Sequence, residues 1–326
     1  MPNRVFKGNH LAGFAHWRRI AAACFIMSLG QAAPAVEYTT QDYLKGVMAC
    51  VQARDYACEE KNYRQLVRLH PNDTTYLFNL GRVMAEQDNH KGAIEQFERA
   101  IALGEGAWNL FGLYAASLAE VGRTDEAIDW SYKTLAVLPS VYDTRSNLVK
   151  YLVQKKRYYE AISVIDDFDE PARAKGEQQY FQGQRIAIES TLDRLGLVSP
   201  AEEKSLRLPK ASRFYYVSVT AGNGKPTPFI LDTGAATMVV NEDFLQRSDA
   251  HYKFVKNVAI GTADGHRSPA RAIVLDSVFV GSFELKNVQA ITCQTCTLLL
   301  GQSVMSRFNV ATSKVQGVEF ATLTLR

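Results

Sequence analysis

The most reactive position in this chain of 326 residues is a carboxylate at a predicted turn. Asp232 follows the apolar run Phe229–Leu231, which predicts an extended strand. Thr233 and Gly234 come next, so the strand is expected to end in a tight turn that presents an ionisable group. Aspartate and glycine are common in ordinary turns, and Asp-Thr-Gly arises by chance in roughly one chain in fifteen of this length. The motif therefore gains its meaning from the segments that follow it.

Those segments come in a fixed order. Apolar Val239-Val240 follows the turn, and a further turn is predicted at Ala263-Asp264-Gly265. Leu298-Leu299-Leu300-Gly301 then gives apolar residues before a glycine. Taken together, residues 213–326 resemble the retropepsin-like aspartic proteases. The resemblance implies a short helix after the strand at Val239-Val240, a flap hairpin with its turn at 262–265, and a short helix after Gly301. The resemblance implies an all-β half-barrel of the acid-protease type, in which the segment ending at Gly301 packs under the catalytic loop.

The same resemblance implies a peptidase with Asp232 as its catalytic carboxylate. Peptide hydrolysis needs a base to activate water and an acid to protonate the leaving amine. Two adjacent carboxylates can do both, because close like charges cannot both ionise and so share one proton. The chain has one Asp-Thr-Gly motif. Asp276-Ser277-Val278 is not a second one, because it lacks the glycine. A homodimer through this domain is therefore expected, with one Asp232 from each subunit at a two-fold axis.

The resemblance also assigns roles to the neighbouring residues. Thr233 is expected to form a hydrogen bond across the axis. Gly234 is expected to allow the tight turn and to donate its N–H to the carboxylate. An extended peptide substrate is expected to contact Ala235 and the hairpin turn, which consists of Thr262, Ala263, Asp264 and Gly265. Neither a metal ion nor a cofactor is implied.

Two features depart from the family pattern. Gln302 follows Gly301, where related domains often have an aliphatic residue or methionine. A Cys293-Gln-Thr-Cys296 motif precedes the same segment, and such a motif can serve redox chemistry or metal binding. The sequence offers neither a second cysteine pair for zinc nor a thioredoxin-like βαβ unit. We therefore expect a structural disulfide beside the active site.

Upstream of this domain the sequence is helical and repetitive. Ala93, Ala127 and Ala161 recur every 34 residues, as small side chains do where two helices cross closely. This period resembles tetratricopeptide arrays. It implies an α-solenoid whose concave face binds a protein or peptide, with a spacer or oligomerisation scaffold as the alternative. Helical pairs are expected near 40–73, 74–107, 108–141 and 142–175, with a capping helix at 176–195.

The first 35 residues predict a secretory signal. A basic segment ends at Arg18-Arg19, an apolar stretch covers Ile20–Leu29, and Ala33-Pro34-Ala35 suits a signal peptidase. The apolar stretch is short for a membrane span, although an uncleaved N-terminal anchor remains the alternative. The signal holds four of the 37 basic residues, which leaves 33 against 34 acidic ones. This near-neutral balance gives no electrostatic reason to expect a nucleic acid partner.

Export to the periplasm or an equivalent space also fits the cysteines. Removal of the signal takes Cys24 and leaves four, an even number that suits two disulfides in an oxidising compartment. Cys50 and Cys58 would clamp the first repeat, or would stay as two buried thiols. The expected organisation is a multidomain α plus β protein: signal peptide 1–35, repeat domain 36–195, linker 196–211 and protease domain 212–326.

The sequence thus predicts an exported aspartic endopeptidase whose repeat domain binds a protein partner or substrate. A catalytically silent protein of the cell envelope, which binds peptide or acts as a scaffold, is the main alternative. Disulfide handling through Cys293 and Cys296 is another. Self-cleavage in the linker would add a further activity.

Overall fold

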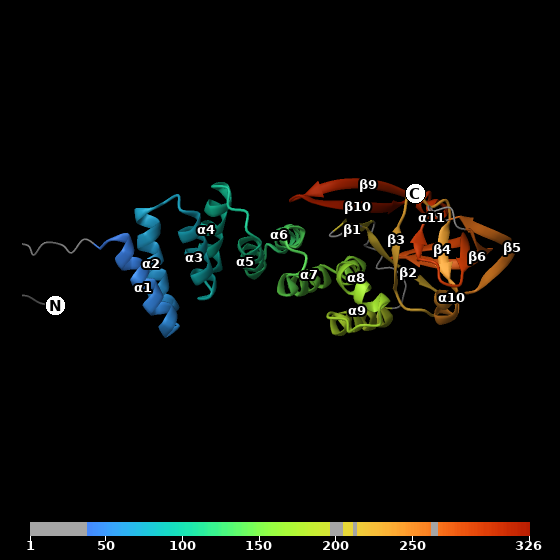
Figure 1. Ribbon diagram of the computed structural model, residues 1–326, viewed down its shortest axis with the longest axis horizontal. Helices are drawn as coiled ribbons and strands as arrows, with labels where there is room; N and C mark the ends of the chain where they lie inside the picture. The colour runs from blue at the N-terminus through green and yellow to red at the C-terminus, as the bar shows by residue number, and fades with distance from the viewer. Residues whose placement is uncertain (1–37, 196–204, 211–213, 262–266) are drawn as a thin grey trace, which may run out of the picture. The chain divides into compact units, whose positions relative to one another are not determined.

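The computed structural model describes residues 38–195, 205–210, 214–261 and 267–326. Helices make up the first of these ranges, and strands with two short helices make up the rest (Figure 1). The predicted signal peptide, the hairpin turn at 262–265 and most of the predicted linker lie outside the described residues.

Eight of the described helices form four successive pairs (Figure 1). Each pair falls within one of the four predicted repeat units, which confirms the solenoid. The pairs are α1 (Thr40–Ala53) with α2 (Tyr56–Leu69), α3 (Thr74–Ala85) with α4 (His90–Ala102), α5 (Trp108–Glu120) with α6 (Thr124–Val137), and α7 (Tyr142–Gln154) with α8 (Tyr158–Ala174). Helix α9 (Gln182–Arg194) follows within the segment predicted to cap the array.

The repeat period reflects close helix crossings. Ala93, Ala127 and Ala161 are fully buried. In the second pair, a Cβ atom on Gly81 would lie 2.6 Å from the Phe97 ring, closer than side-chain atoms approach. Small residues recur because α3 and α4, and their equivalents, would otherwise be pushed apart.

The first pair departs from the repeat and compensates for it. Glu59 stands where the repeat has alanine, and it is only 2% exposed. A buried carboxylate needs a charged partner, and Arg82 of α3 donates to Glu59 at 2.8 Å. The structure also joins Cys50 to Cys58 in a disulfide across the turn between α1 and α2.

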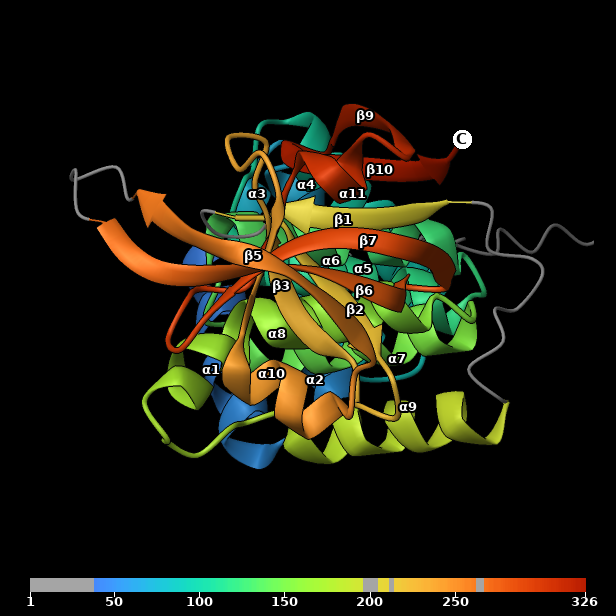
Figure 2. The same cartoon turned by 90° about the vertical axis from the view of Figure 1, so that its right-hand side faces the viewer.

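The described strands form two sheets. The larger has the order β2-β3-β8-β4-β7-β6-β5, and β2 also pairs with β6, which closes it into a barrel. Strands β5 and β6 form a long hairpin at its edge (Figure 2). The strands of the larger sheet are β2 (Tyr216–Ala221), β3 (Thr227–Leu231), β4 (Met238–Asn241), β5 (Tyr252–Gly261), β6 (Arg267–Val280), β7 (Phe283–Cys293) and β8 (Leu299–Leu300). Helix α10 (Glu242–Ser248) lies between β4 and β5 in the chain, and helix α11 (Gln302–Met305) follows β8.

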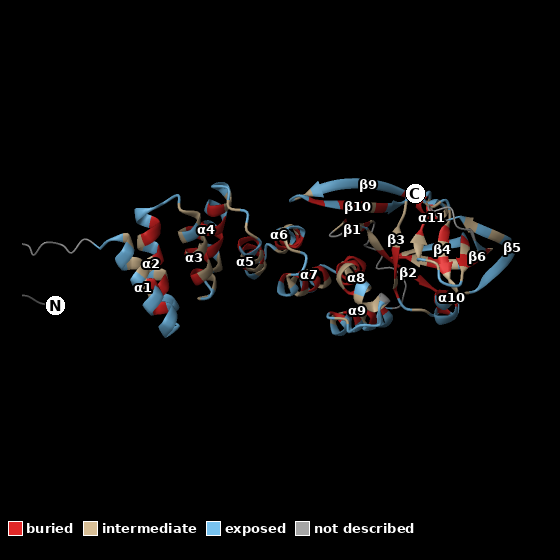
Figure 3. Ribbon diagram, viewed as in Figure 1, coloured by how far each residue is buried: buried red, intermediate tan, exposed pale blue. Residues whose placement is uncertain are grey.

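The smaller sheet contains two strands that the sequence did not reveal. Its order is β1 (Leu206–Lys210), β10 (Val318–Leu325) and β9 (Phe308–Val315). Residues 206–210 were expected to belong to the linker, but Leu206 and Leu208 are buried and the segment pairs with β10. Pro209 is tolerated because β1 is an edge strand. Strand β9 is exposed along most of its length (Figure 3), so it lacks the apolar alternation that marks a strand.

The last repeats share their core with the strands. One cluster of buried side chains runs from α6–α9 into both sheets, and a second cluster holds α1–α5. At this junction the rings of Tyr132 and Phe320 meet edge to face at 4.9 Å, and the Arg207 guanidinium lies 3.6 Å from the Phe320 ring centre. The repeat array therefore contacts the β domain by packing as well as by chain connection.

A buried ion network adds to this junction. Arg185 of α9 donates to Asp166 of α8, to Glu189 at 2.9 Å, and to the carbonyl oxygen of Pro226 at 2.6 Å. Arg173 also contacts Asp166, at 3.2 Å. Burial raises the pKa of Asp166, although the two arginines act in the opposite direction. Arg185 is thus the charge that links two helices to the turn before β3.

We expect Arg185→Met to lower the free energy of unfolding by about 3 kcal/mol, because removing one partner leaves Asp166 and Glu189 buried with incomplete compensation. Arg247→Met is the matched control. The Arg247 side chain is 63% exposed and pairs with Asp243 within one helix, so its loss should cost less than about 0.5 kcal/mol. Urea unfolding of both variants measures the difference, and equal costs would contradict a structural role for the network.

No helix among the described residues is long and apolar enough to cross a membrane.

Candidate active site

Asp232 lies immediately after β3, at a central position in the barrel. Phe229 of β3 is fully buried, while β2 and β8 flank the strand. The backbone N–H of Asp232 donates to the carbonyl oxygen of Leu300 at 3.2 Å. The strand therefore brings a half-buried carboxylate to the end of a well-packed element, as the sequence predicted.

The turn after Asp232 orients its side chain. The N–H of Gly234 donates to Asp232 Oδ1 at 2.8 Å, which is the contact predicted for this glycine. Thr233 and Gly234 are exposed, and Ala235 is half-buried. One carboxylate oxygen is held by the backbone, and the second makes no hydrogen bond with any residue that the structure describes.

The segment that ends at Gly301 packs against this turn and against the end of β3. Leu298 accepts a hydrogen bond from the N–H of Ile230 at 3.0 Å, and β8 runs parallel to the end of β3. A Cβ atom on Gly301 would lie 2.4 Å from the carbonyl oxygen of Thr237 and 2.6 Å from that of Ala235. Glycine is required here by space, because the backbone of the turn after Asp232 passes directly over it.

Gln302 and Ser303 hold the same turn, and the sequence did not predict these roles. The backbone N–H of Gln302 donates to Ala235 O at 2.8 Å, and its side-chain amide donates to Thr233 O at 3.2 Å. Ser303 Oγ accepts from the N–H of Met238 at 2.9 Å and donates to Gln289 O at 2.8 Å. Gln302, which departs from the family pattern, therefore supplies a bond that an aliphatic residue could not.

The predicted substrate contacts are described only in part. Thr262, Ala263, Asp264 and Gly265 lie outside the described residues, between β5 and β6.

Asp276 lies within β6, as expected, and its side chain is exposed. The part of the chain that the structure describes holds no group of three or more His, Cys, Asp or Glu side chains able to bind a metal ion.

The second cysteine pair directly precedes the segment that ends at Gly301. The structure joins Cys293, the last residue of β7, to Cys296 in a disulfide. Asn241 Nδ2 donates to the carbonyl oxygen of Cys296 at 3.2 Å, and Asn241 Oδ1 accepts from the N–H of Phe244 at the start of α10. The disulfide turn is thus tied to the end of β4.

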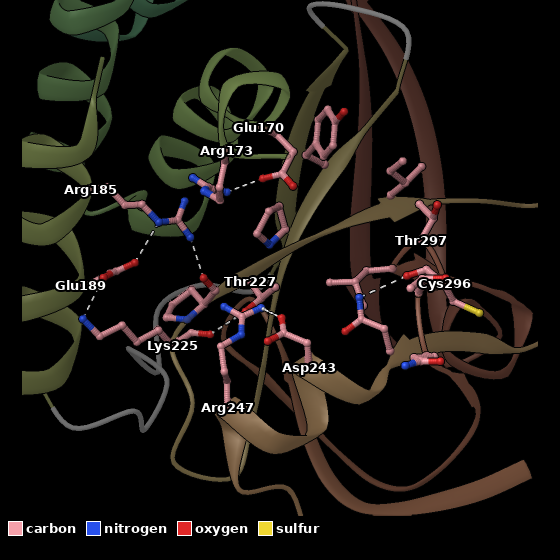
Figure 4. Close-up of a pocket in the computed structure, with 18 residues that line it drawn as sticks. Glu170, Arg173, Arg185, Glu189, Lys225, Thr227, Asp243, Arg247, Cys296 and Thr297 are labelled. Atoms are coloured by element: carbon pink, nitrogen blue, oxygen red, sulfur yellow. Dashed lines mark hydrogen bonds and ion pairs between the residues drawn. The ribbon is translucent and has the colours of Figure 1, made fainter. Parts of the chain in front are cut away.

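A large cleft lies apart from Asp232. It has a volume of about 1010 Å³ and lies between α8–α9, the start of β3 and the disulfide turn (Figure 4). Arg185 and Glu189 lie on one side of it, and Cys296 and Thr297 on the other (Figure 4). Asp232 lines neither this cleft nor the two smaller ones found among the described residues.

The floor of this cleft is unsuited to an added strand. The backbone N–H of Ile230 points away from β2 and donates to Leu298, so every second N–H group of β3 points to the side opposite β2. Pro228 occupies the preceding outward position and has no N–H to donate. The cleft therefore does not offer the ladder of hydrogen bonds that an extended substrate peptide needs.

Comparisons with known proteins agree with this geometry. Residues 219–307 match the family model described as "gag-polyprotein putative aspartyl protease". This range includes Asp232, the disulfide turn and Gly301. Comparison with curated proteins finds no match.

Solved structures show a likeness to each half of the chain. A retropepsin-like aspartic protease from Rickettsia conorii is 21% identical, with 37% of this chain and 89% of that chain covered and a TM-score of 0.28. MamA protein is 14% identical, with 48% and 95% covered and a TM-score of 0.38. YrrB, a TPR protein with an unusual peptide-binding site, is 16% identical, with 48% and 84% covered and a TM-score of 0.37.

The family match, the clamped Asp232 and the four helical pairs point to the same organisation. The chain joins an array of helical pairs, arranged as in tetratricopeptide repeats, to a β domain in which residues 219–307 match the family model of a putative aspartyl protease.

Proposed function

We propose that this protein is an exported aspartic endopeptidase that acts as a homodimer, with a repeat array that binds its protein partner or substrate. The observation that carries this proposal is the environment of Asp232. Its backbone is held by Leu300 and one carboxylate oxygen by Gly234, while the side chain is half-buried. Such a group is oriented for reaction, and the exposed Thr233 and Gly234 beside it leave this turn open to a second chain.

A second copy of the chain completes the site in this proposal. One Asp232 from each subunit would form a dyad that carries a single proton. The ionised carboxylate takes a proton from water, which attacks the peptide carbonyl, and the protonated carboxyl supplies the proton for the leaving amine. Thr233, which is exposed, would form a hydrogen bond with the partner's turn, and the β5–β6 hairpin would cover the bound peptide.

The two disulfides support export, because they persist in oxidising compartments. The helical pairs support a protein-binding role, since stacked pairs of this kind form extended concave surfaces. The shared core between the last repeats and the strands would hold a bound partner close to the catalytic domain.

The experiment compares mature wild-type protein with Asp232→Asn. Both are incubated with a diverse peptide mixture from acidic to neutral pH and analysed by mass spectrometry, while the molecular mass in solution is recorded. We expect cuts that require the dimer and vanish in the variant. A confirmed dimer of the wild type that makes no cut would overturn the enzyme proposal and favour a silent peptide-binding or scaffold protein.

A further inference from the structure

The disulfide turn, residues Cys293–Cys296, lines two neighbouring open clefts. Cys296 lines the larger cleft, and Cys293 lines a neighbouring one of about 610 Å³ that also borders β5 and β6. Both cysteines are partly exposed, and Gln294 and Thr295 between them are exposed. Figure 4 shows Cys296 on the side of the cleft opposite the helices. A thiol in solution can therefore reach this disulfide.

The turn is connected by short contacts to the backbone that holds the catalytic carboxylate. Cys293 pairs in register with Asn241 of β4, and Asn241 also binds the carbonyl oxygen of Cys296. Two residues further on, Leu298 accepts from the N–H of Ile230, and Leu300 accepts from the N–H of Asp232. The disulfide therefore fixes the start of the segment whose carbonyl groups support β3 and Asp232.

We infer that the Cys293–Cys296 disulfide is a thiol-exchange site, through which an exported dithiol protein or small dithiol loosens the support of Asp232. A thiolate of the dithiol attacks one of the two sulfurs, forms a mixed disulfide and releases the other cysteine as a thiolate. The second thiolate of the dithiol then displaces the remaining cysteine and leaves the dithiol oxidised. Two electrons pass to the protein, and two protons from the dithiol or solvent complete its two thiols.

The other disulfide provides an internal comparison. Cys50 is 2% exposed and Cys58 is partly exposed, so a thiolate can approach only one sulfur of this bond, whereas both sulfurs of Cys293–Cys296 belong to partly exposed residues. Cys293 and Cys296 are three residues apart, so their bond closes a short ring and restrains little of the unfolded chain. Its reduction is expected to act locally, on the loop and its hydrogen bonds, with the fold retained.

The inference goes beyond the proposed function, and only its effect on activity depends on that function. The test uses the full mature chain in dithiothreitol buffers of graded reduced-to-oxidised ratio. Differential alkylation and mass spectrometry measure which cysteines are reduced. Amide hydrogen exchange of the peptide that covers residues 227–237 is followed in the same samples, before alkylation. Cys50→Ser/Cys58→Ser isolates the second disulfide, and Cys293→Ser/Cys296→Ser removes it.

We expect Cys293–Cys296 to be reduced before Cys50–Cys58. Reduction should accelerate amide exchange in residues 227–237 by about tenfold or more and leave the helical circular dichroism unchanged, and reoxidation should reverse it. Cys293→Ser/Cys296→Ser should exchange like reduced protein at every ratio. If this variant does not fold, the reversible reduction of Cys50→Ser/Cys58→Ser protein still decides the question.

Unchanged exchange at 227–237 after complete reduction of Cys293–Cys296 would overturn the inference and leave the bond as a surface staple. Resistance of this bond at ratios that reduce Cys50–Cys58 would overturn it as well. The two proposals fail separately. Accelerated amide exchange without any peptide cleavage supports the thiol-exchange site and counts against the protease. Equal cleavage in both redox states, with unchanged amide exchange, supports the protease and counts against the thiol-exchange site.

Discussion

Adding inactive Asp232→Asn protein to a fixed amount of wild-type protein is expected to lower cleavage. Asp232→Asn alone should lose roughly 10²- to 10⁴-fold or more of the activity, because the dyad loses its acid–base group. In the mixture, mixed dimers carry one carboxylate and one amide. With equal amounts and free exchange of subunits, about half of the activity should remain, and with a threefold excess of the variant about a quarter.

The matched control is Asp276→Asn, which changes an exposed aspartate of the same domain and leaves Asp232 in place. Its addition should not lower the activity of the wild type. The rate of peptide cleavage, read after the subunits have re-equilibrated, provides the measurement. If Asp232→Asn is inactive by itself and yet has no effect in the mixture, each active unit contains one Asp232, and the dyad is wrong.

Gly301→Ala is expected to damage both stability and activity through one steric conflict. The added Cβ atom would lie within 2.6 Å of the carbonyl oxygens of Thr237 and Ala235, so the catalytic turn must move. The φ angle of Gly301 is −94°, which alanine adopts readily, so the cost is steric and not conformational. We expect a loss of about 1–3 kcal/mol in the free energy of unfolding. Misplacement of Asp232 by about 1 Å should reduce cleavage by roughly 10²-fold.

Gly183→Ala makes the same chemical change where it should do no harm. Gly183 lies in α9, and a Cβ atom there meets nothing within 4 Å. Helix propensity predicts a gain of about 0.5–1 kcal/mol and unchanged cleavage. Urea unfolding and peptide cleavage of both variants test the argument. A Gly301→Ala protein as stable and as active as the wild type would show that the turn can shift without cost.

The sequence by itself determined the features that depend on local spacing. The period of Ala93, Ala127 and Ala161 predicted four helical pairs, because a crossing of two helices needs a small residue at each repeat. The apolar run before Asp232 and the glycine after it predicted a strand that ends in a carboxylate-bearing turn. The structure confirms both predictions. Each depends only on residues that lie within one or two neighbouring elements of the chain, so the local sequence is enough to predict it.

Only the tertiary structure decided the contacts between distant segments. Strand β1 has only five residues, one of them proline, and it forms a strand because it pairs with β10. At its end Lys210 donates a hydrogen bond to Glu319, which lies 109 residues further along the chain. Glu59 is stable in a core position because Arg82 lies opposite, which no local pattern encodes.

The same reason explains what the sequence missed at the site. Gln302 looked like a departure from a family pattern until the fold placed its amide against Thr233, and Asn241 gained its role when β4 met the disulfide turn. Hydrogen bonds between segments far apart in the chain depend on how the barrel closes. The sequence therefore specified the reactive carboxylate, and the fold specified the residues that hold it in place.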